Sequence, residues 1–166
     1  MKYYIAYGSN MSVEQMARRC PNAKLVGKAM LQDWKLKFKI HATIEQCEGS
    51  YVHALVWKID KEDEKSLDEY EGWPAYYIKQ DVEVTMTELD GTKPQKVTAM
   101  AYIMTEGHQE SIPTPVYYDV MAEAYKRFGF DEAILQEALN EAMNAAAARN
   151  AAKTTARMKI KTRKGE

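Results

Sequence analysis

Cysteine, glycine and proline are scarce in this sequence of 166 residues, and it contains no long hydrophobic run. The two cysteines, Cys20 and Cys47, are too few for a disulfide scaffold. No uninterrupted apolar stretch approaches the roughly 20 residues that span a bilayer. Lys2 leads directly into a short apolar segment that is typical of a strand and not of a secretory signal. We therefore expect a cytoplasmic protein without a membrane partner.

The motifs of phosphate, dinucleotide and zinc sites are also missing. The chain contains neither the P-loop pattern GxxxxGK[ST] nor the dinucleotide fingerprint GxGxxG, and it has no zinc-ligand spacing. These absences argue against an enzyme that depends on a bound nucleotide or on zinc.

The formal net charge of −1 conceals an uneven distribution along the chain. Residues 1–148 carry 16 Lys and Arg against 23 Asp and Glu, whereas residues 149–166 carry seven basic residues against one acidic residue. The acidic body does not offer phosphate groups the basic face that they require, so we expect no nucleic-acid partner. We predict a single domain over residues 1–148, followed by a basic C-terminal tail over residues 149–166.

Hydrophobic periodicity predicts many short strands with helices around them. In residues 35–40, lysines alternate with apolar residues, which predicts one wet and one buried face. The fold class is therefore α+β, with a small, mostly antiparallel, curved sheet or barrel and peripheral helices. The predicted strands cover residues 2–7, 24–46, 52–59, 80–88 and 96–105; the predicted helices begin after Ser12 and cover 61–71, about 116–128, and 131 onward, with fraying after Ala148.

The first candidate site is the segment Tyr7, Gly8, Ser9 and Asn10, which follows the first predicted strand and precedes a helix. Gly8 permits backbone torsions that other residues resist. The free N–H groups at the start of the following helix would point into this turn, which favours the binding of a small anion. A carboxylate fits the loop better than a phosphate, because the loop is short and contains one glycine.

The second candidate site is Glu71, at the end of the acidic helix 61–71. At about 100° per residue, Glu71 lies roughly 40° around the helix axis from the apolar Leu67, whereas Glu69 lies roughly 160° away, towards water. Burial and the negative end of the helix dipole both raise the pKa of a carboxyl group in this position. Glu71 is therefore a candidate general acid/base, the rival interpretation being a carboxylate paired with a core tyrosine or a buried N–H.

With YGSN near the N-terminus and SLDEYEG at residues 66–72, the chain resembles the gamma-glutamylcyclotransferase superfamily. The segments LQDWKL at 31–36, VWKI at 56–59 and PTPVY at 113–117 are similar to further family segments, in the same order. The resemblance covers about residues 3–130. It implies a small β-barrel with outer helices and a cavity at one end.

The resemblance also implies the roles of individual residues. Tyr7, Gly8, Ser9 and Asn10 would hold the α-carboxylate of a small γ-glutamyl substrate, and Glu71 would be the general acid/base. Tyr117 and Tyr77 would line the pocket, with Tyr76 as the competitor of Tyr77. The implied reaction is the cyclisation of a γ-glutamyl group to 5-oxoproline with release of the attached amine or amino acid, without a cofactor. Relatives occur as monomers and dimers, so a homodimer is compatible with the resemblance.

Three alternatives stay open at the level of sequence. A cysteine-dependent hydrolase would need Cys47 beside one of the histidines His41, His53 and His108. A non-catalytic sensor would use the same cavity to bind γ-glutamyl or amino-acid-like ligands without turnover. An interaction module would act through the basic tail.

Overall fold

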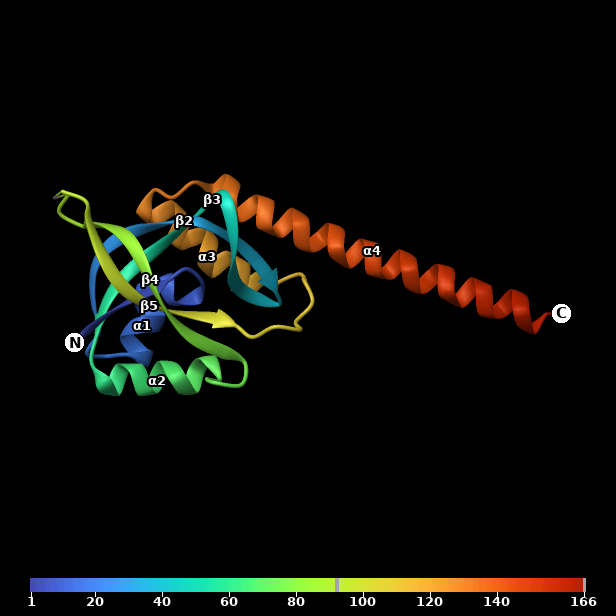
Figure 1. Ribbon diagram of the computed structural model, residues 1–166, viewed down its shortest axis with the longest axis horizontal. Coiled ribbons are helices and arrows are strands. Elements are labelled where there is room, and N and C mark those ends of the chain that lie inside the picture. The colour runs from blue at the N-terminus through green and yellow to red at the C-terminus, as the bar shows by residue number, and fades with distance from the viewer. Residues whose placement is uncertain (92, 166) are drawn as a thin grey trace.

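Five strands close into a barrel in the computed structural model, which describes residues 1–91 and 93–165 (Figure 1). The strand order around the barrel is β1-β3-β2-β4-β5, and the closing contact is a parallel pairing of β1 with β5 at Tyr4 and Met100. The other pairings are antiparallel. The elements are β1 (Lys2–Ala6), the 3-10 turn η1 (Ser9–Met11), α1 (Val13–Arg19), β2 (Lys24–Lys39), β3 (His41–Ile59), α2 (Lys61–Glu71), β4 (Tyr77–Glu88), β5 (Gln95–Met104), α3 (Pro115–Phe128) and α4 (Glu132–Lys164).

This architecture confirms the predicted α+β class, and alternation along the strands explains it. In the hairpin of β4 and β5, Val82, Val84 and Met86 are buried inside the barrel. The turn after β4 contains Gly91 at a φ of 81°, in the left-handed region that glycine favours. The core lies within the closed sheet and continues between the sheet and the outer helices.

The ends of α2 agree with the prediction as well. Asp60 caps the N-terminus, and its side chain and that of Asp63 bond reciprocally to each other's backbone N–H groups. Gly72 ends the helix at a φ of 66° and donates to the carbonyl groups of Asp68 and Glu69. Both caps fix where α2 stops, and therefore which way its last residue, Glu71, points.

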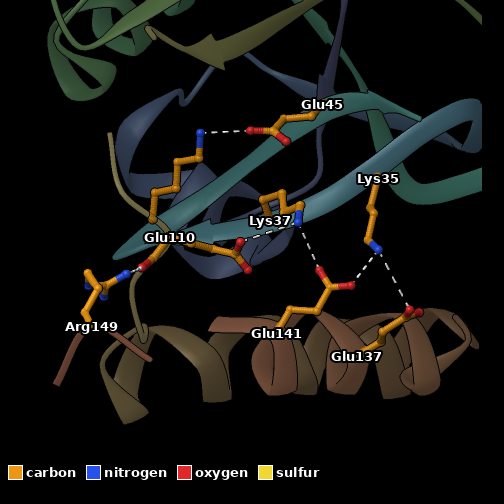
Figure 2. A network of polar contacts seen from close by, with 8 residues as sticks. Lys35, Lys37, Glu45, Glu110, Glu137, Glu141 and Arg149 are labelled. Carbon is orange, nitrogen blue, oxygen red and sulfur yellow. Dashed lines mark hydrogen bonds and ion pairs between the residues drawn. The ribbon is translucent and has the colours of Figure 1, made fainter. Parts of the chain in front are cut away.

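The predicted wet face of residues 35–40 is only partly exposed, whereas Leu36 and Phe38 on the opposite face are buried as predicted. The lysine side chains Lys35, Lys37 and Lys39 are only 26%, 20% and 17% exposed. Helix α4 lies across this part of β2 and presents carboxylates to the first two lysines, as Figure 2 shows. Ile40, predicted to be buried, is half exposed because it occupies the tight connection between β2 and β3 at a φ of 68°.

The predicted fraying after Ala148 is also wrong, since α4 continues without a break to Lys164. Its second half leaves the body and extends alone (Figure 1). Residue 166, the last of the predicted tail, lies outside the described residues. Across the described part of the chain, no helix has both the length and the apolar character required to cross a membrane.

Candidate active site

One cavity of about 320 Å³ opens at the end of the barrel where β1 runs into η1. Its walls come from segments far apart in the sequence: the 4–10 segment, the start of β3, the end of α2, the start of β4, β5 and α3. All of the residues predicted for the site line it: Tyr7, Gly8, Ser9, Asn10, Glu71, Tyr76, Tyr77 and Tyr117. The further lining residues are Tyr4, Ile5, His41, Ala42, Glu69, Tyr70, Gly72 and Tyr102.

The loop at Gly8 differs in one respect from its prediction. It enters the short turn η1 first, and the helix α1 starts only at Val13. A Cβ atom on Gly8 would lie 2.9 Å from the Tyr117 hydroxyl, so glycine is required by close approach. The amide of Ala42 donates to the same hydroxyl at 3.0 Å, and the amide of Ser9 also bonds to it. Tyr117 thus holds α3 against the loop.

The side chain of Asn10 is committed within the protein. Its Nδ2 donates to the Tyr4 hydroxyl at 3.0 Å, and its Oδ1 accepts a hydrogen bond from Arg19 Nη1. Because both ends of the amide are occupied, the side chain of Asn10 fixes the loop and leaves ligand contacts to the backbone.

Two buried tyrosines of the cavity, Tyr7 and Tyr77, donate their hydroxyl groups to the backbone. Tyr7 donates to the carbonyl of Tyr102, and Tyr77 donates to the carbonyl of Ala42 at 2.8 Å. Burial raises the pKa of both phenols well above the ordinary value. These side chains therefore form neutral, rigid walls over the pH range in which proteins fold.

Tyr76 and Tyr77, the two candidates for one position of the pocket wall, both line the cavity. Tyr77, the first residue of β4, is 5% exposed, whereas Tyr76 is more exposed and lies 3.4 Å from His41 Nδ1 through its hydroxyl. The ring of Tyr76 also packs against His108. Tyr77 thus belongs to the inner wall and Tyr76 to the rim.

Glu71 is the acidic group placed deepest in the cavity. Burial raises its pKa to about 7, and the positive charge of Arg19 opposes this rise. The prediction that Glu71 faces inward and Glu69 faces solvent is correct, although Glu69 also reaches the rim of the cavity. At neutral pH Glu71 is close to the midpoint of its titration, where a carboxyl group both accepts and returns a proton.

Arg19 is the residue that the sequence did not point to. Its guanidinium carbon lies 3.4 Å from the centre of the Tyr70 ring, while its Nη1 bonds to Asn10. Tyr70 in turn shares a hydrogen bond of 3.0 Å with Ser9 Oγ. Arg19 therefore joins the loop to the end of α2. An arginine in the last turn of a helix is ordinarily explained by the helix dipole, so its sequence position carried no signal.

The structure gives no support to a thiol nucleophile. Cys20 is buried, and burial raises the pKa of its thiol to about 12. Cys47 lies outside the cavity lining and accepts a hydrogen bond from Ser50 at 3.4 Å. The histidines contact other groups: His53 accepts from the amide of Asp131, and His108 bonds to Thr105. Within the described residues, no group of three or more His, Cys, Asp or Glu side chains is arranged to hold a metal ion.

Comparison with known proteins gives consistent matches. The model of the family described as gamma-glutamyl cyclotransferase, AIG2-like, matches residues 4–124. The gamma-glutamylcyclotransferase of Homo sapiens is 33% identical over 139 residues, which is 76% of this chain and 71% of that protein. The Mus musculus gamma-glutamylcyclotransferase is 32% identical over 142 residues, covering 78% of this chain and 72% of that protein. A solved gamma-glutamyl cyclotransferase structure superposes with a TM-score of 0.70 at 29% identity, covering 82% of this chain and 85% of that one.

Proposed function

The chain belongs to the gamma-glutamyl cyclotransferase family, and from this premise we propose how its cavity performs the reaction of a gamma-glutamylcyclotransferase. The protein is an enzyme that cyclises the γ-glutamyl group of a small molecule to 5-oxoproline and releases the attached amine or amino acid. The observation that supports our assignment of residues is the opening of Glu71 into the same cavity as the loop of residues 7–10.

We assign recognition of the substrate to the loop. The backbone N–H groups of the loop other than that of Ser9, which bonds to Tyr117, would receive the α-carboxylate, with Tyr7, Tyr77 and Tyr117 as walls around the γ-glutamyl chain. The volume of about 320 Å³ is at the lower end of the range of small-molecule sites. A fixed α-carboxylate selects the rotamer in which the α-amine faces the γ-carbonyl, and such preorganisation contributes several kcal/mol to an intramolecular reaction.

We assign proton transfer to Glu71. The α-ammonium group of the substrate, with a pKa of about 8, is mostly charged at neutral pH and cannot attack. Glu71 removes one proton, and the freed amine forms a C–N bond to the γ-carbonyl carbon. Glu71 delivers this proton to the leaving nitrogen as the bond from the carbon to that nitrogen breaks. The second proton, which the attacking nitrogen loses when it becomes the lactam N–H, follows the same route through Glu71, so the amine departs as an ammonium ion. The atoms balance without water or an external reactant.

The decisive experiment is the release of 5-oxoproline from a panel of γ-glutamyl compounds by the Glu71→Gln variant. We expect a loss of turnover of about 10²-fold or more, because one group serves as both base and acid, while binding of the substrate persists. Glu69→Gln is the matched control, since it removes the same charge two residues away at an exposed position. Turnover in Glu71→Gln close to that of the wild type would contradict the assignment. Binding without any product in the wild type would favour a sensor.

We also propose the cytoplasm as the compartment of the enzyme, because Cys20 and Cys47 are both free thiols. Fractionation of cells that produce the tagged protein tests this location. The family resemblance allows either a monomer or a homodimer, and light scattering on the purified enzyme distinguishes them.

A further inference from the structure

The second half of α4 carries positive charge that the body of the protein does not neutralise. From Ala142 to Gly165 the sequence contains no acidic residue. We define the basic extension as residues 150–164, which are all exposed. Its basic residues are Lys153, Arg157, Lys159, Lys161, Arg163 and Lys164.

The first half of α4 is held firmly, so the direction of the basic extension is fixed. Glu141 bridges Lys35 and Lys37 of β2 at 2.5 and 3.1 Å, and Arg149 donates to the backbone carbonyl of Glu110 (Figure 2). Buried small and apolar residues, such as Leu135 and Ala142, pack the same half of the helix onto the body. Beyond Arg149, the hydrogen bonds found in the described chain are those of the helix with itself, as at Thr154 and Thr162.

Distance separates this charge from the acidic body. Fifteen helical residues extend roughly 22 Å, whereas the Debye length at physiological ionic strength is about 8 Å. Most of the basic extension therefore lies beyond the reach of the electrostatic field of the body. The body is acidic, because residues 1–148 contain 23 acidic and 16 basic residues. A polyanion can approach the end of α4 without repulsion from the rest of the chain.

The basic side chains cover more than half of the circumference of the helix. Lys153, Arg157, Lys161 and Lys164 follow at spacings of four, four and three residues and so share one face. Lys159 and Arg163 extend that face on its flank. The remaining face carries Ala151, three threonines and the exposed Met158. The exposed Ile160 lies about 160° around the helix axis from Met158, among the basic residues. The two apolar side chains therefore do not form the stripe with which an amphipathic helix enters a lipid surface.

We propose that the basic extension is a sequence-independent binding site for the phosphate backbone of double-stranded DNA. A helix with its side chains is about 10–12 Å across and enters the B-form major groove, which is about 12 Å wide. Cations spread over more than half of the helix then face phosphates on both walls of the groove. The deep, narrow major groove of A-form RNA does not admit the helix. This proposal departs from the expectation of no nucleic-acid partner, which was based on the acidic charge of residues 1–148.

The test uses the full chain and a fluorescent 20-base-pair DNA duplex of arbitrary sequence, with binding followed by anisotropy between 50 and 200 mM NaCl. Contacts from all six cations predict a slope of log K against log salt of about −5, which is a loss of up to about 10³-fold over that range. Truncation after Arg149 should abolish binding while 5-oxoproline release stays unchanged. That activity also shows that the truncated protein is folded.

Single substitutions make the test independent of truncation. Lys153→Gln and Lys161→Gln should each reduce the slope by about 1, whereas Lys96→Gln, at an exposed site on β5, should leave it unchanged. Binding to the duplex that survives truncation would overturn the proposal. Tighter binding to a 20-base-pair RNA duplex, or to vesicles containing anionic lipid, would overturn it too. The proposal would also be overturned if the full chain did not bind the DNA duplex but formed an oligomer that truncation after Arg149 abolishes.

Discussion

Replacing Glu71 by glutamine should change how the stability of the protein depends on pH. In the folded protein burial raises the pKa of this carboxyl group to about 7, from an ordinary value of 4.5. The folded state therefore holds a proton that the unfolded chain has already released between these two pH values. Stability due to the protonated group is complete below pH 4.5, falls as the pH rises, and is lost above about pH 7. The ionised carboxylate at high pH is the destabilising form.

The size of the effect follows from the same two values. Each tenfold difference in proton affinity corresponds to about 1.4 kcal/mol, so the wild type should lose at most about 3 kcal/mol of unfolding free energy between pH 4.5 and pH 8 through this one group. Glutamine does not titrate, and Glu71→Gln should lose none of it. For a protein of this size, the difference corresponds to a relative shift in Tm of about 6–12 °C.

The assay is urea unfolding of both proteins at half-unit steps from pH 4.5 to pH 8.5, followed by circular dichroism. The difference in unfolding free energy should grow steadily up to pH 7 in favour of Glu71→Gln and then remain constant. Glu69→Gln, which is exposed, should give a difference that does not vary with pH. A constant difference for Glu71→Gln as well would refute the burial of this carboxyl group, and with it the basis for its role as a proton carrier.

Three further predictions test the surroundings of Glu71. In the pH profile of kcat/KM, Arg19→Gln should move the midpoint of the acidic limb upward from about 7, because it removes the cation that favours the ionised form of Glu71. Arg19→Lys keeps the positive charge and should leave this midpoint nearly in place. An unchanged profile in Arg19→Gln would exclude this electrostatic role of Arg19. Gly8→Ala should lower the unfolding free energy by about 1–3 kcal/mol in urea, since the added methyl group meets the Tyr117 hydroxyl at 2.9 Å, and Tyr117→Phe should recover part of that loss when combined with it. Alkylation of the accessible thiol with iodoacetamide should leave 5-oxoproline release unchanged, and inactivation would revive the thiol mechanism.

Local patterns in the sequence were sufficient to predict the helices and strands, but not which of these elements lie next to each other. Asp60 and Gly72 mark both ends of α2 because capping depends on residues close in sequence. Barrel closure depends instead on the pairing of Tyr4 with Met100, almost a hundred residues apart, and a period of two residues does not identify a pairing partner. For the same reason the sequence predicts solvent around Lys35 and Lys37 of β2, because Glu141, which pairs with both, comes about a hundred residues later.

The same division applies to the site. The inward direction of Glu71 follows from its angle to Leu67 on a single helix, so the sequence was enough to predict it. The link from Arg19 through Tyr70 to Ser9 joins α1, α2 and η1, and no spacing in the sequence expresses it. The continuation of α4 was missed because apolar periodicity ends near Ala148. Alanine, arginine, lysine and methionine have high intrinsic helix propensity, and this sustains the helix where packing no longer does.

The hydrogen bonds of the cavity explain why a single carboxyl group is left to carry the proton. Tyr7 and Tyr77 each donate to a backbone carbonyl, and burial keeps their pKa values far above neutrality. Burial lowers the pKa of His41 below its ordinary 6.5, so this imidazole is mainly neutral at pH 7. Among the described residues that line the cavity, Glu71 is the carboxyl group whose pKa burial raises towards neutrality. The reaction needs a group that takes up a proton and returns it within one cycle. With a pKa of about 7, Glu71 has the proton affinity that suits both steps near neutral pH.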